Sequence, residues 1–193
     1  MPVPDVRGIL LAAGGARRFG SPKLLQPLAG DVPIAVQATR RLLRALPESI
    51  AVIRPEDEAL RTLLAAEGIG IISNRRAEEG VGTSLACGVN ATPDAGGWVI
   101  ALADMPFIRE KTIAAVARAI EEGAAIAAPV FAGQRGHPVG FARRFFAELA
   151  TLSGDHGARH IIDRYKERVA LLAVDDPHIH RDVDTLSDLR RPA

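Results

Sequence analysis

The chain has 193 residues, of which 48% are hydrophobic, and this is enough to fill the core of one domain. Its 24 Lys and Arg residues nearly balance 23 Asp and Glu residues, so the formal net charge is +1. Such a balance supplies no strong field for attracting nucleic acid or an anionic membrane. We therefore expect a single domain over residues 1–193 that binds neither nucleic acid nor a membrane and holds any anion by local contacts.

Cysteine usage and the N-terminal segment bear on the compartment. Cys87 is the only cysteine, which excludes an internal disulfide and a cysteine-cluster zinc site. Its small neighbours favour a residue packed in a helix over a reactive thiol, because no base or cation stands beside it. The first apolar stretch breaks at Gly14 and Gly15, too early for a signal peptide or a membrane span. These features predict a cytoplasmic protein.

Apolar runs of strand length alternate with longer stretches of helical period along the whole chain. This pattern is typical of a three-layer α/β fold, in which helices cover both faces of a mostly parallel sheet. The expected strands are 8–12, 50–53, 70–73, 98–102, 125–128 and 169–174. Because ligands bind outside the carboxyl ends of such strands, the loops after Ala12, Ser73 and Leu102 should lie near one another.

Two of the connecting segments have clear helical signals. Pro33 suits the first turn of a helix, where its missing N–H has no cost, and that helix should bury Ala35, Ala38, Leu42 and Leu46. Its arginines, Arg40, Arg41 and Arg44, would then face water. A second amphipathic helix is expected over 113–120, and Gly123 follows it as a stop signal.

The loop after the first expected strand is rich in glycine and basic residues. Residues 10–25 read Leu-Leu-Ala-Ala-Gly-Gly-Ala-Arg-Arg-Phe-Gly-Ser-Pro-Lys-Leu-Leu. Glycines let backbone N–H groups approach a polyphosphate, and Arg18 and Lys23 would supply the countercharge. The spacing matches neither the P-loop nor the G-x-G-x-x-G dinucleotide motif. Taken alone, the segment is either a phosphate cradle or an ordinary glycine turn.

Acidic residues appear where a cation site would need them. Asp104 follows the strand 98–102, and the next helix is expected to begin only near Glu110, which leaves this carboxylate free to bind a hard cation. Near the C-terminus, strand alternation would place Asp182 and Asp184 on one side, where they could share a Mg²⁺ ion with Asp104. Asp184 also suits the cap of a following helix, and both interpretations remain open.

The histidines do not have the pattern of a zinc protease. His156 and His160 stand at i, i+4, but the residue after the first is Gly157, where such a helix needs Glu. We therefore expect no zinc site. Hydrogen bonding to a polar ligand is the favoured role for His137 and His156.

Taken together, several of these segments resemble the MobA-like nucleotidyltransferase family. They are Leu-Ala-Ala-Gly-Gly at 11–15, Arg-Phe-Gly at 18–20, Pro-Lys-Leu-Leu at 22–25, Gly-Thr-Ser-Leu at 82–85 and Ala-Asp-Met-Pro at 103–106. Arg-Gly-His-Pro at 135–138, Gly-Asp-His-Gly-Ala-Arg at 154–159 and Asp-Val-Asp-Thr at 182–185 narrow the resemblance to the molybdenum cofactor cytidylyltransferase branch. The order of the motifs covers nearly the whole chain.

This resemblance implies a Rossmann-like fold of the nucleotide-diphospho-sugar transferase type and a set of site residues. The nucleotide would contact Leu11, Ala12, Ala13, Gly14, Gly15, Lys23, Ser84 and Asp104. Lys23, Arg18 and Asp104 would be catalytic, and Asp104, Asp182 and Asp184 would hold Mg²⁺. His137, Asp155 and Arg159 would face a molybdopterin acceptor.

The same resemblance implies transfer of CMP from CTP to the phosphate of molybdopterin, with release of pyrophosphate and a molybdenum hydroxylase as recipient of the product. Ala13 agrees with the branch that uses CTP, where the guanylyl branch has glycine. Ala103 departs from the usual glycine or cysteine before the aspartate. The alternatives are a guanylyltransferase or other NTP transferase of the same fold, and a carrier of the molybdenum cofactor without catalytic activity.

Overall fold

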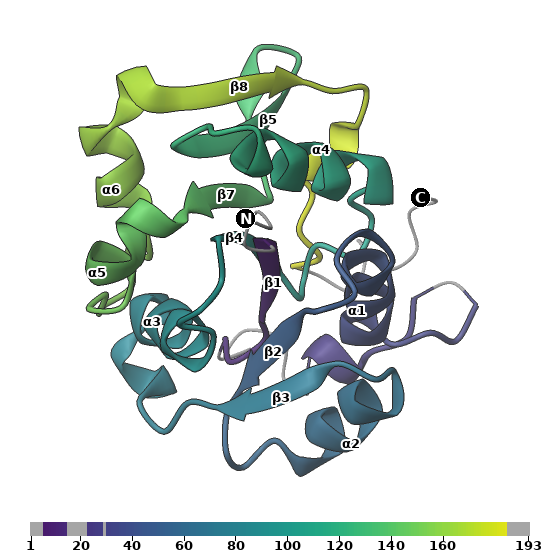
Figure 1. Cartoon of the computed structure of the whole chain (residues 1–193). Coiled ribbons are helices and arrows are strands. Elements are labelled where there is room, and N and C mark those ends of the chain that lie inside the picture. The colour runs from purple at the N-terminus through teal and green to yellow at the C-terminus, as the bar shows by residue number, and fades with distance from the viewer. Residues whose placement is uncertain (1–5, 15–22, 29, 185–193) are drawn as a thin grey trace.

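The computed structural model describes residues 6–14, 23–28 and 30–184. Within this part of the chain, all strands belong to one sheet in the order β3-β2-β1-β4-β7-β5, and both β6 and β8 pair with β5 (Figure 1). The strands are β1 Val6–Leu11, β2 Ile50–Ile53, β3 Gly70–Ser73, β4 Gly97–Leu102, β5 Ile126–Phe131, β6 Gln134–Arg135, β7 Val139–Ala142 and β8 Val169–Ala173. The single-domain α/β fold and the mostly parallel sheet are confirmed.

Helices cover both faces of this sheet. The α-helices are α1 Ile34–Ala45, α2 Glu58–Ala66, α3 Val81–Ala91, α4 Glu110–Glu121, α5 Phe146–Leu149 and α6 Arg159–Arg164. Apolar side chains of α1, α2 and α4 form one core, and those of α3, α5 and α6 form a second core across the sheet (Figure 1). These two cores make the molecule the three-layer structure that the alternating pattern predicts.

The sequence pattern missed two antiparallel strands. The short strand β7 lies between β4 and β5 and pairs antiparallel with both, and β6 has only two residues. No long apolar run marks β7, because Gly140 interrupts it. A Cβ atom at this position would lie 2.8 Å from side-chain atoms of both Val116 and Ile120 on α4. Glycine therefore lets α4 pack directly on the backbone of β7.

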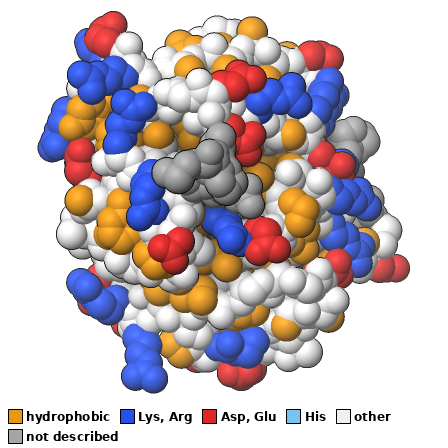
Figure 2. Space-filling model, viewed as in Figure 1, with side chains coloured by type: hydrophobic (Ala, Val, Ile, Leu, Met, Phe, Trp, Pro, Cys, Tyr) orange, Lys and Arg blue, Asp and Glu red, His pale blue; other side chains and the backbone are white. Residues whose placement is uncertain are grey.

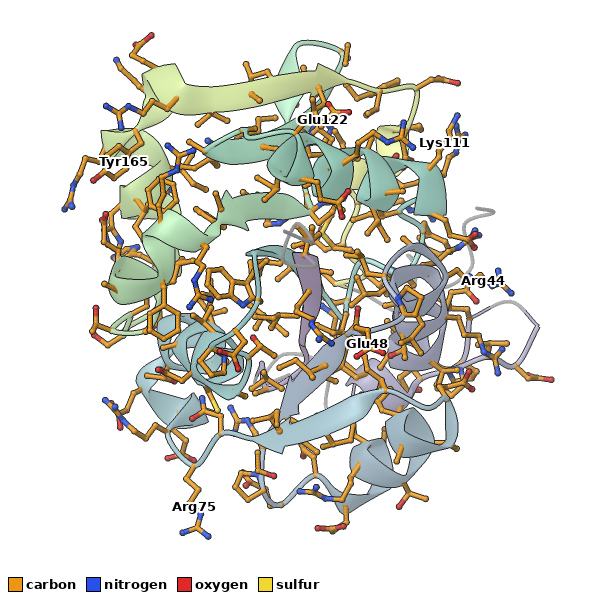
Figure 3. All side chains as sticks on the ribbon, viewed as in Figure 1. Arg44, Glu48, Arg75, Lys111, Glu122 and Tyr165 are labelled. Atoms are coloured by element: carbon orange, nitrogen blue, oxygen red, sulfur yellow. The ribbon has the colours of Figure 1, made fainter. Side chains whose placement is uncertain are left out.

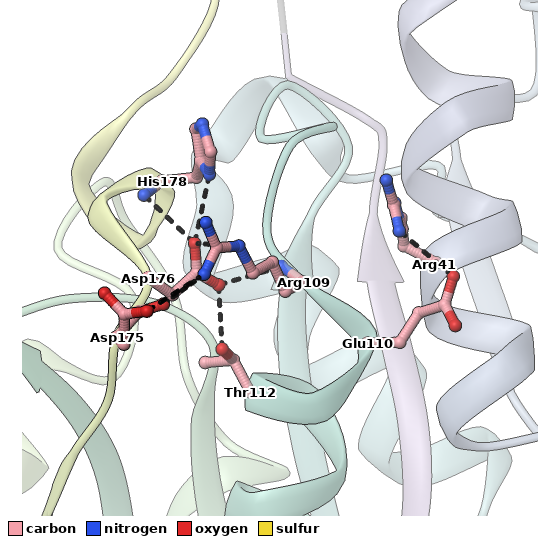
Figure 4. Close-up of polar contacts among 7 residues, drawn as sticks. All are labelled: Arg41, Arg109, Glu110, Thr112, Asp175, Asp176 and His178. Carbon is pink, nitrogen blue, oxygen red and sulfur yellow. Dashed lines mark hydrogen bonds and ion pairs between the residues drawn. The ribbon is translucent and has the colours of Figure 1, made fainter. Parts of the chain in front are cut away.

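Helix α1 follows Pro33, which caps the helix and is not its first residue. Ala35, Ala38 and Leu42 are buried as expected, and Leu46 is buried at the helix end. The arginines do more than face water. Arg40 binds Glu67 after α2 at 2.8 Å. Arg41 binds Glu110 at the start of α4 at 3.1 Å (Figure 4), and Arg44 binds the same carboxylate at 2.8 Å.

The carboxyl ends of the central strands meet at one edge of the sheet, as the sequence predicts. Leu11 of β1 pairs with Leu102 of β4, and Ile53 of β2 pairs with Ser73 of β3. The backbone ladder continues past each strand, since Ala103 N–H donates to the Leu11 carbonyl at 3.1 Å. Three loops therefore leave the sheet side by side.

The surface carries charges of both signs. Figure 2 shows Lys and Arg side chains interspersed with Asp and Glu across the visible face, with no extended field of one sign. Arg44 and Lys111 project outward from α1 and α4 (Figure 3). Among the described residues, every helix is too short or too polar to cross a bilayer.

Candidate active site

The start of the loop after β1, residues 12–14, is held against the sheet. Ala12 and Ala13 are buried, and Gly14 is exposed. The Arg54 side chain, which follows β2, donates a 2.9 Å hydrogen bond from Nε to the Ala13 carbonyl. Gly15 and Arg18, which the sequence assigns to the nucleotide site, lie outside the described residues. Arg54 therefore fixes the start of this loop, a role that no sequence motif indicated.

Lys23 lies between two carboxylates from distant parts of the chain. Its Nζ is 3.1 Å from Oδ2 of Asp104 and 2.8 Å from Oδ1 of Asp184. Only 11% of the Lys23 side chain is exposed, whereas the Asp184 side chain is 65% exposed. The structure thus brings together three of the residues that the sequence assigns to catalysis and metal binding.

The acidic residues also determine the charge state of this cluster. Burial alone would lower the pKa of Lys23, but hydrogen bonds and charges from Asp184 and Asp104 outweigh it and raise the pKa. Lys23 is therefore a protonated ammonium at neutral pH. Partial desolvation, a hydrogen bond with Asp184 and the negative charges of Asp184 and Asp104 raise the pKa of Asp182. Asp104, Asp182 and Asp184 thus form an acidic cluster beside Lys23.

The segment carrying Asp182 and Asp184 is not the strand that alternation suggested, since residues 181–184 have irregular backbone. Burial still alternates along it. Val183 is fully buried beside Leu28 and Ile34, while both aspartates are exposed. In the described part of the chain this segment pairs with no strand, and Val183 N–H instead donates to the Asp104 carbonyl at 2.9 Å. The helix that Asp184 would cap lies outside the described residues.

Asp176 anchors the start of this C-terminal segment (Figure 4). Its buried carboxylate accepts hydrogen bonds from Arg109 N–H at 2.8 Å, Thr112 Oγ1 at 2.7 Å and His178 N–H at 3.2 Å. Burial would raise the pKa of Asp176, but these hydrogen bonds outweigh that effect and lower it. The carboxylate therefore caps the N-terminus of α4 and ties residues 175–184 to it.

His137 lies at the same edge of the sheet as Asp104, because β7 begins beside the carboxyl end of β4, where Val139 pairs with Ile100. Its N–H donates to the Ile179 carbonyl at 2.9 Å, and among the described residues its buried Nδ1 has no hydrogen-bond partner. Burial lowers the pKa of His137, and the positive charges of Arg135 and His180 add to this effect against the opposing charge of Asp104. His137 is therefore a neutral imidazole with one unused ring nitrogen near the acidic cluster.

The first turn of α3 carries Ser84, which the sequence assigns to the nucleotide. Ser84 is 3% exposed, and its Oγ accepts a 3.0 Å hydrogen bond from Nδ2 of Asn74, the residue after β3. Gly82 N–H donates to the Gly154 carbonyl at 2.9 Å, so the 153–155 loop packs on this turn. Sequence analysis missed Asn74, although its place after β3 at the carboxyl edge was a usable signal.

The acceptor candidates do not form one cluster. Asp155 lies beside Gly80, where an added Cβ would collide with its carboxylate, and so belongs with the start of α3. Arg159 is on the surface, with its side chain 78% exposed and 3.8 Å from Asp163 on the same helix. His137, in contrast, lies within electrostatic reach of Asp104. The structure therefore groups only His137 with the residues that bind Lys23.

The acidic cluster has the donor chemistry of a Mg²⁺ or Mn²⁺ site. In the part of the chain that the structure describes, no three His, Cys, Asp or Glu side chains are arranged to enclose a metal ion. Mg²⁺ in nucleotide enzymes, however, binds one or two carboxylates and takes its other ligands from phosphates and water. Asp104 and Asp184, which meet at Lys23, offer such a pair. The residues present therefore fit a metal that arrives with a triphosphate.

Several known proteins are similar to this chain over most of its length. Nicotine blue oxidoreductase of Paenarthrobacter nicotinovorans is 28% identical over 98% of this chain and 97% of its own length. Purine catabolism protein PucB of Bacillus subtilis (strain 168) is 30% identical over 84% of this chain and 82% of its own. The crystal structure of Rv0371c from Mycobacterium tuberculosis H37Rv superimposes with a TM-score of 0.84 at 28% identity, covering 97% of both chains.

A nucleotidyl transferase from Methanothermobacter thermautotroptrophicus has the same fold, with a TM-score of 0.79 at 19% identity over 95% of this chain and 94% of its own. Residues 8–169 match the model of the MobA-like NTP transferase domain, a range that includes Lys23, Ser84 and Asp104. The matched range ends before Asp182 and Asp184. The chain belongs to the family of MobA-like NTP transferase domains.

Proposed function

We propose that this protein transfers CMP from CTP to the terminal phosphate of molybdopterin-type molybdenum cofactor and releases pyrophosphate. One observation carries the proposal: Lys23, at the end of the glycine-rich loop, is held by Asp104 and Asp184 at the carboxyl edge of the sheet. A buried ammonium next to paired carboxylates suits a triphosphate that binds together with a divalent cation. The expected recipient of the product is a molybdenum hydroxylase, and the expected location is the cytoplasm.

In this reaction, an oxygen of the acceptor phosphate attacks the α-phosphorus of CTP in line with the leaving pyrophosphate. The new bond joins that oxygen to the α-phosphorus, and the bond from the α-phosphorus to the bridging oxygen breaks. The attacking phosphate is already anionic, so no strong general base is required. The protein's contribution is then positioning and stabilisation of charge, for which Lys23 is the described cation nearest to Asp104.

Asp104 and Asp184 would hold the metal ion, with Asp182 beside them. When bound, Mg²⁺ would neutralise charge on the phosphate oxygens. Rv0371c has also been solved in complex with manganese, at 28% identity and a TM-score of 0.80. This supports a divalent cation as a participant in the proposed reaction.

His137 is our candidate for contact with the acceptor, because its buried Nδ1 has no hydrogen-bond partner among the described residues and its neutral imidazole lies within electrostatic reach of Asp104. A neutral ring can donate to or accept from a polar group on the pterin or its phosphate. Asp155, beside the start of α3, and Arg159, on the surface, are proposed as further acceptor residues.

The test is pyrophosphate release from CTP, GTP, ATP and UTP with Mg²⁺ and purified molybdenum cofactor. Release confined to CTP supports the proposal, whereas release with GTP would assign the protein to guanylyl transfer. Tight binding of the cofactor without release from any nucleotide would identify a carrier. Product analysis should detect the dinucleotide form of the cofactor in the same reaction.

A further inference from the structure

Asn74, Thr83 and Ser84 form a buried hydrogen-bond network at the start of α3. The three residues are 5%, 4% and 3% exposed, so solvent offers them few alternative partners. Asn74 Nδ2 lies 3.0 Å from Thr83 Oγ1 and 3.0 Å from Ser84 Oγ. The direction of each hydrogen bond is therefore determined by the protein.

The backbone fixes the orientation of the Asn74 amide. Its Oδ1 accepts a 2.9 Å hydrogen bond from the main-chain N–H of Arg76, which can only donate. Nδ2 must then point to the two hydroxyl groups and donate one N–H to each. Thr83 and Ser84 both act as acceptors toward Asn74.

The two hydroxyl protons have different destinations. Thr83 Oγ1 lies 2.7 Å from the Arg76 carbonyl and 2.9 Å from the Gly80 carbonyl, and so donates its proton within the protein. The Ser84 hydroxyl accepts a hydrogen bond from Asn74, but among the described residues it has no acceptor for its own proton.

Packing of α3 shows where Ser84 faces. Gly88, one turn later on the same side, lies so close to β1 and β2 that an added Cβ would be 2.7 Å from Ile9 and 3.1 Å from Val52. One helical turn advances about 5.4 Å, or roughly two strand residues. Ser84, one turn before Gly88, is thus level with Leu11 and the loop that begins at Ala12, on the side of α3 that lies against the sheet.

We propose that Asn74 is a positioning residue that fixes the Ser84 hydroxyl as a hydrogen-bond donor toward the nucleotide base. Such a donor selects a base that presents an acceptor at this place. Cytosine does so at O2 and N3, whereas the N1–H and N2–H side of guanine presents donors. This inference rests on the proposed nucleotide transfer and names the part of the site that selects the base.

Asn74→Asp reverses the polarity with little change in shape. The carboxylate still accepts from Arg76 N–H, but it now also accepts the Ser84 proton, which leaves Ser84 only lone pairs for the ligand. We expect the affinity for CTP to fall about tenfold or more, with a smaller loss for GTP, so that the preference between the bases narrows. Binding of each triphosphate is measured by calorimetry, and folding is checked by circular dichroism and thermal melting.

Three further variants separate the direction of the Ser84 hydrogen bond from a general disturbance of the network. Thr83→Val disturbs the same network but leaves Ser84 accepting from Asn74. The affinities for all the nucleoside triphosphates should therefore fall by the same factor, and the base preference should not change. Ser84→Ala removes the donor, and adding Asn74→Asp to it should cause no further change in base preference. Asn74→Ala frees the Ser84 hydroxyl without burying a charge and should also narrow the preference, which keeps the test valid if Asn74→Asp unfolds.

The outcomes distinguish this inference from the proposed function. If the wild-type protein binds no nucleoside triphosphate, the proposed function itself is wrong. A wild-type protein with a base preference that Asn74→Asp and Asn74→Ala leave unchanged would overturn the role of Asn74 alone. A narrowed preference in both variants, absent in Thr83→Val, supports it.

Discussion

The main-chain N–H of Val183 donates a 2.9 Å hydrogen bond to the carbonyl oxygen of Asp104. This bond joins the loop after β4 to the C-terminal segment through backbone atoms alone. The flanking residues Asp182 and Asp184 are exposed, and Asp184 reaches Lys23. The acidic cluster is therefore assembled by main-chain pairing and by burial of the Val183 side chain.

Asp104→Asn should reduce pyrophosphate release by about a hundredfold or more, since the amide keeps the shape but loses the charge that would hold the metal. Binding of Mn²⁺, followed by electron paramagnetic resonance, should weaken in parallel. Asp94→Asn is the matched control, because Asp94 is exposed in the loop that precedes β4. Full activity in Asp104→Asn would place the metal on other residues.

The helices and strands of the fold can be predicted from the spacing of apolar residues, whereas the candidate site can be predicted only in part. Four central strands come from buried apolar runs, and the rule for their carboxyl ends brings Lys23 and Asp104 together. The same rule could have indicated Asn74 and Arg54, each of which follows a strand at that edge. Their partners could not be predicted, because the Arg54 hydrogen bond to Ala13 depends on where the loop backbone comes to lie.

Asp176 shows what the sequence alone could not supply. Nothing near it marks a cap for α4, since the helix and the aspartate are separated by four strands and two further α-helices. Its role depends on tertiary packing that brings residues 175–178 against Arg109 and Thr112 (Figure 4). Likewise, the strand β7 could not be predicted from an apolar run, because Gly140 interrupts that run. Glycine is needed at this position so that α4 can pack against the backbone of β7.

Lys23→Met should have opposite effects on the two ligands. Without the ammonium, the triphosphate loses a charge-assisted contact, and its affinity should fall by about tenfold or more. Asp104 and Asp184 lose their shared cation, so binding of Mn²⁺ in the absence of nucleotide should become tighter. Lys111→Met, on the exposed side of α4, is the control and should change neither. If both ligands bind more weakly in Lys23→Met, the ion pairs have only a structural role.

Asp176→Asn should lower the free energy of unfolding at neutral pH by about 1–3 kcal/mol, because hydrogen bonds to a buried charged group are weakened. The pKa of Asp176 is lowered in the folded state from its ordinary value of 3.8. Its contribution is therefore present above about pH 4 and is lost as pH falls through the folded-state pKa. Urea unfolding between neutral and acidic pH measures both effects.

The control for this prediction is Asp175→Asn. Asp175 precedes Asp176 but its side chain is 88% exposed, so the change should remain within about 0.5 kcal/mol. Wild type and Asp175→Asn should lose stability together on acidification, while Asp176→Asn should lose less. Equal acid sensitivity in all three proteins would mean that other carboxylates dominate.

Gly80→Ala tests whether the packing of the 153–155 loop positions Ser84. Gly80 has φ +111°, and a Cβ there would collide with the backbone of Gly154 and the side chain of Asp155. Gly68 also has a positive φ, +85°, but an added Cβ would meet no atom within 4 Å. Both alanine variants should lose about 1 kcal/mol to backbone strain, and Gly80→Ala should lose about 1–3 kcal/mol more to overpacking. Only Gly80→Ala should also weaken CTP binding, because the first turn of α3 must shift; equal CTP affinity in the two variants would show that Ser84 does not depend on this packing.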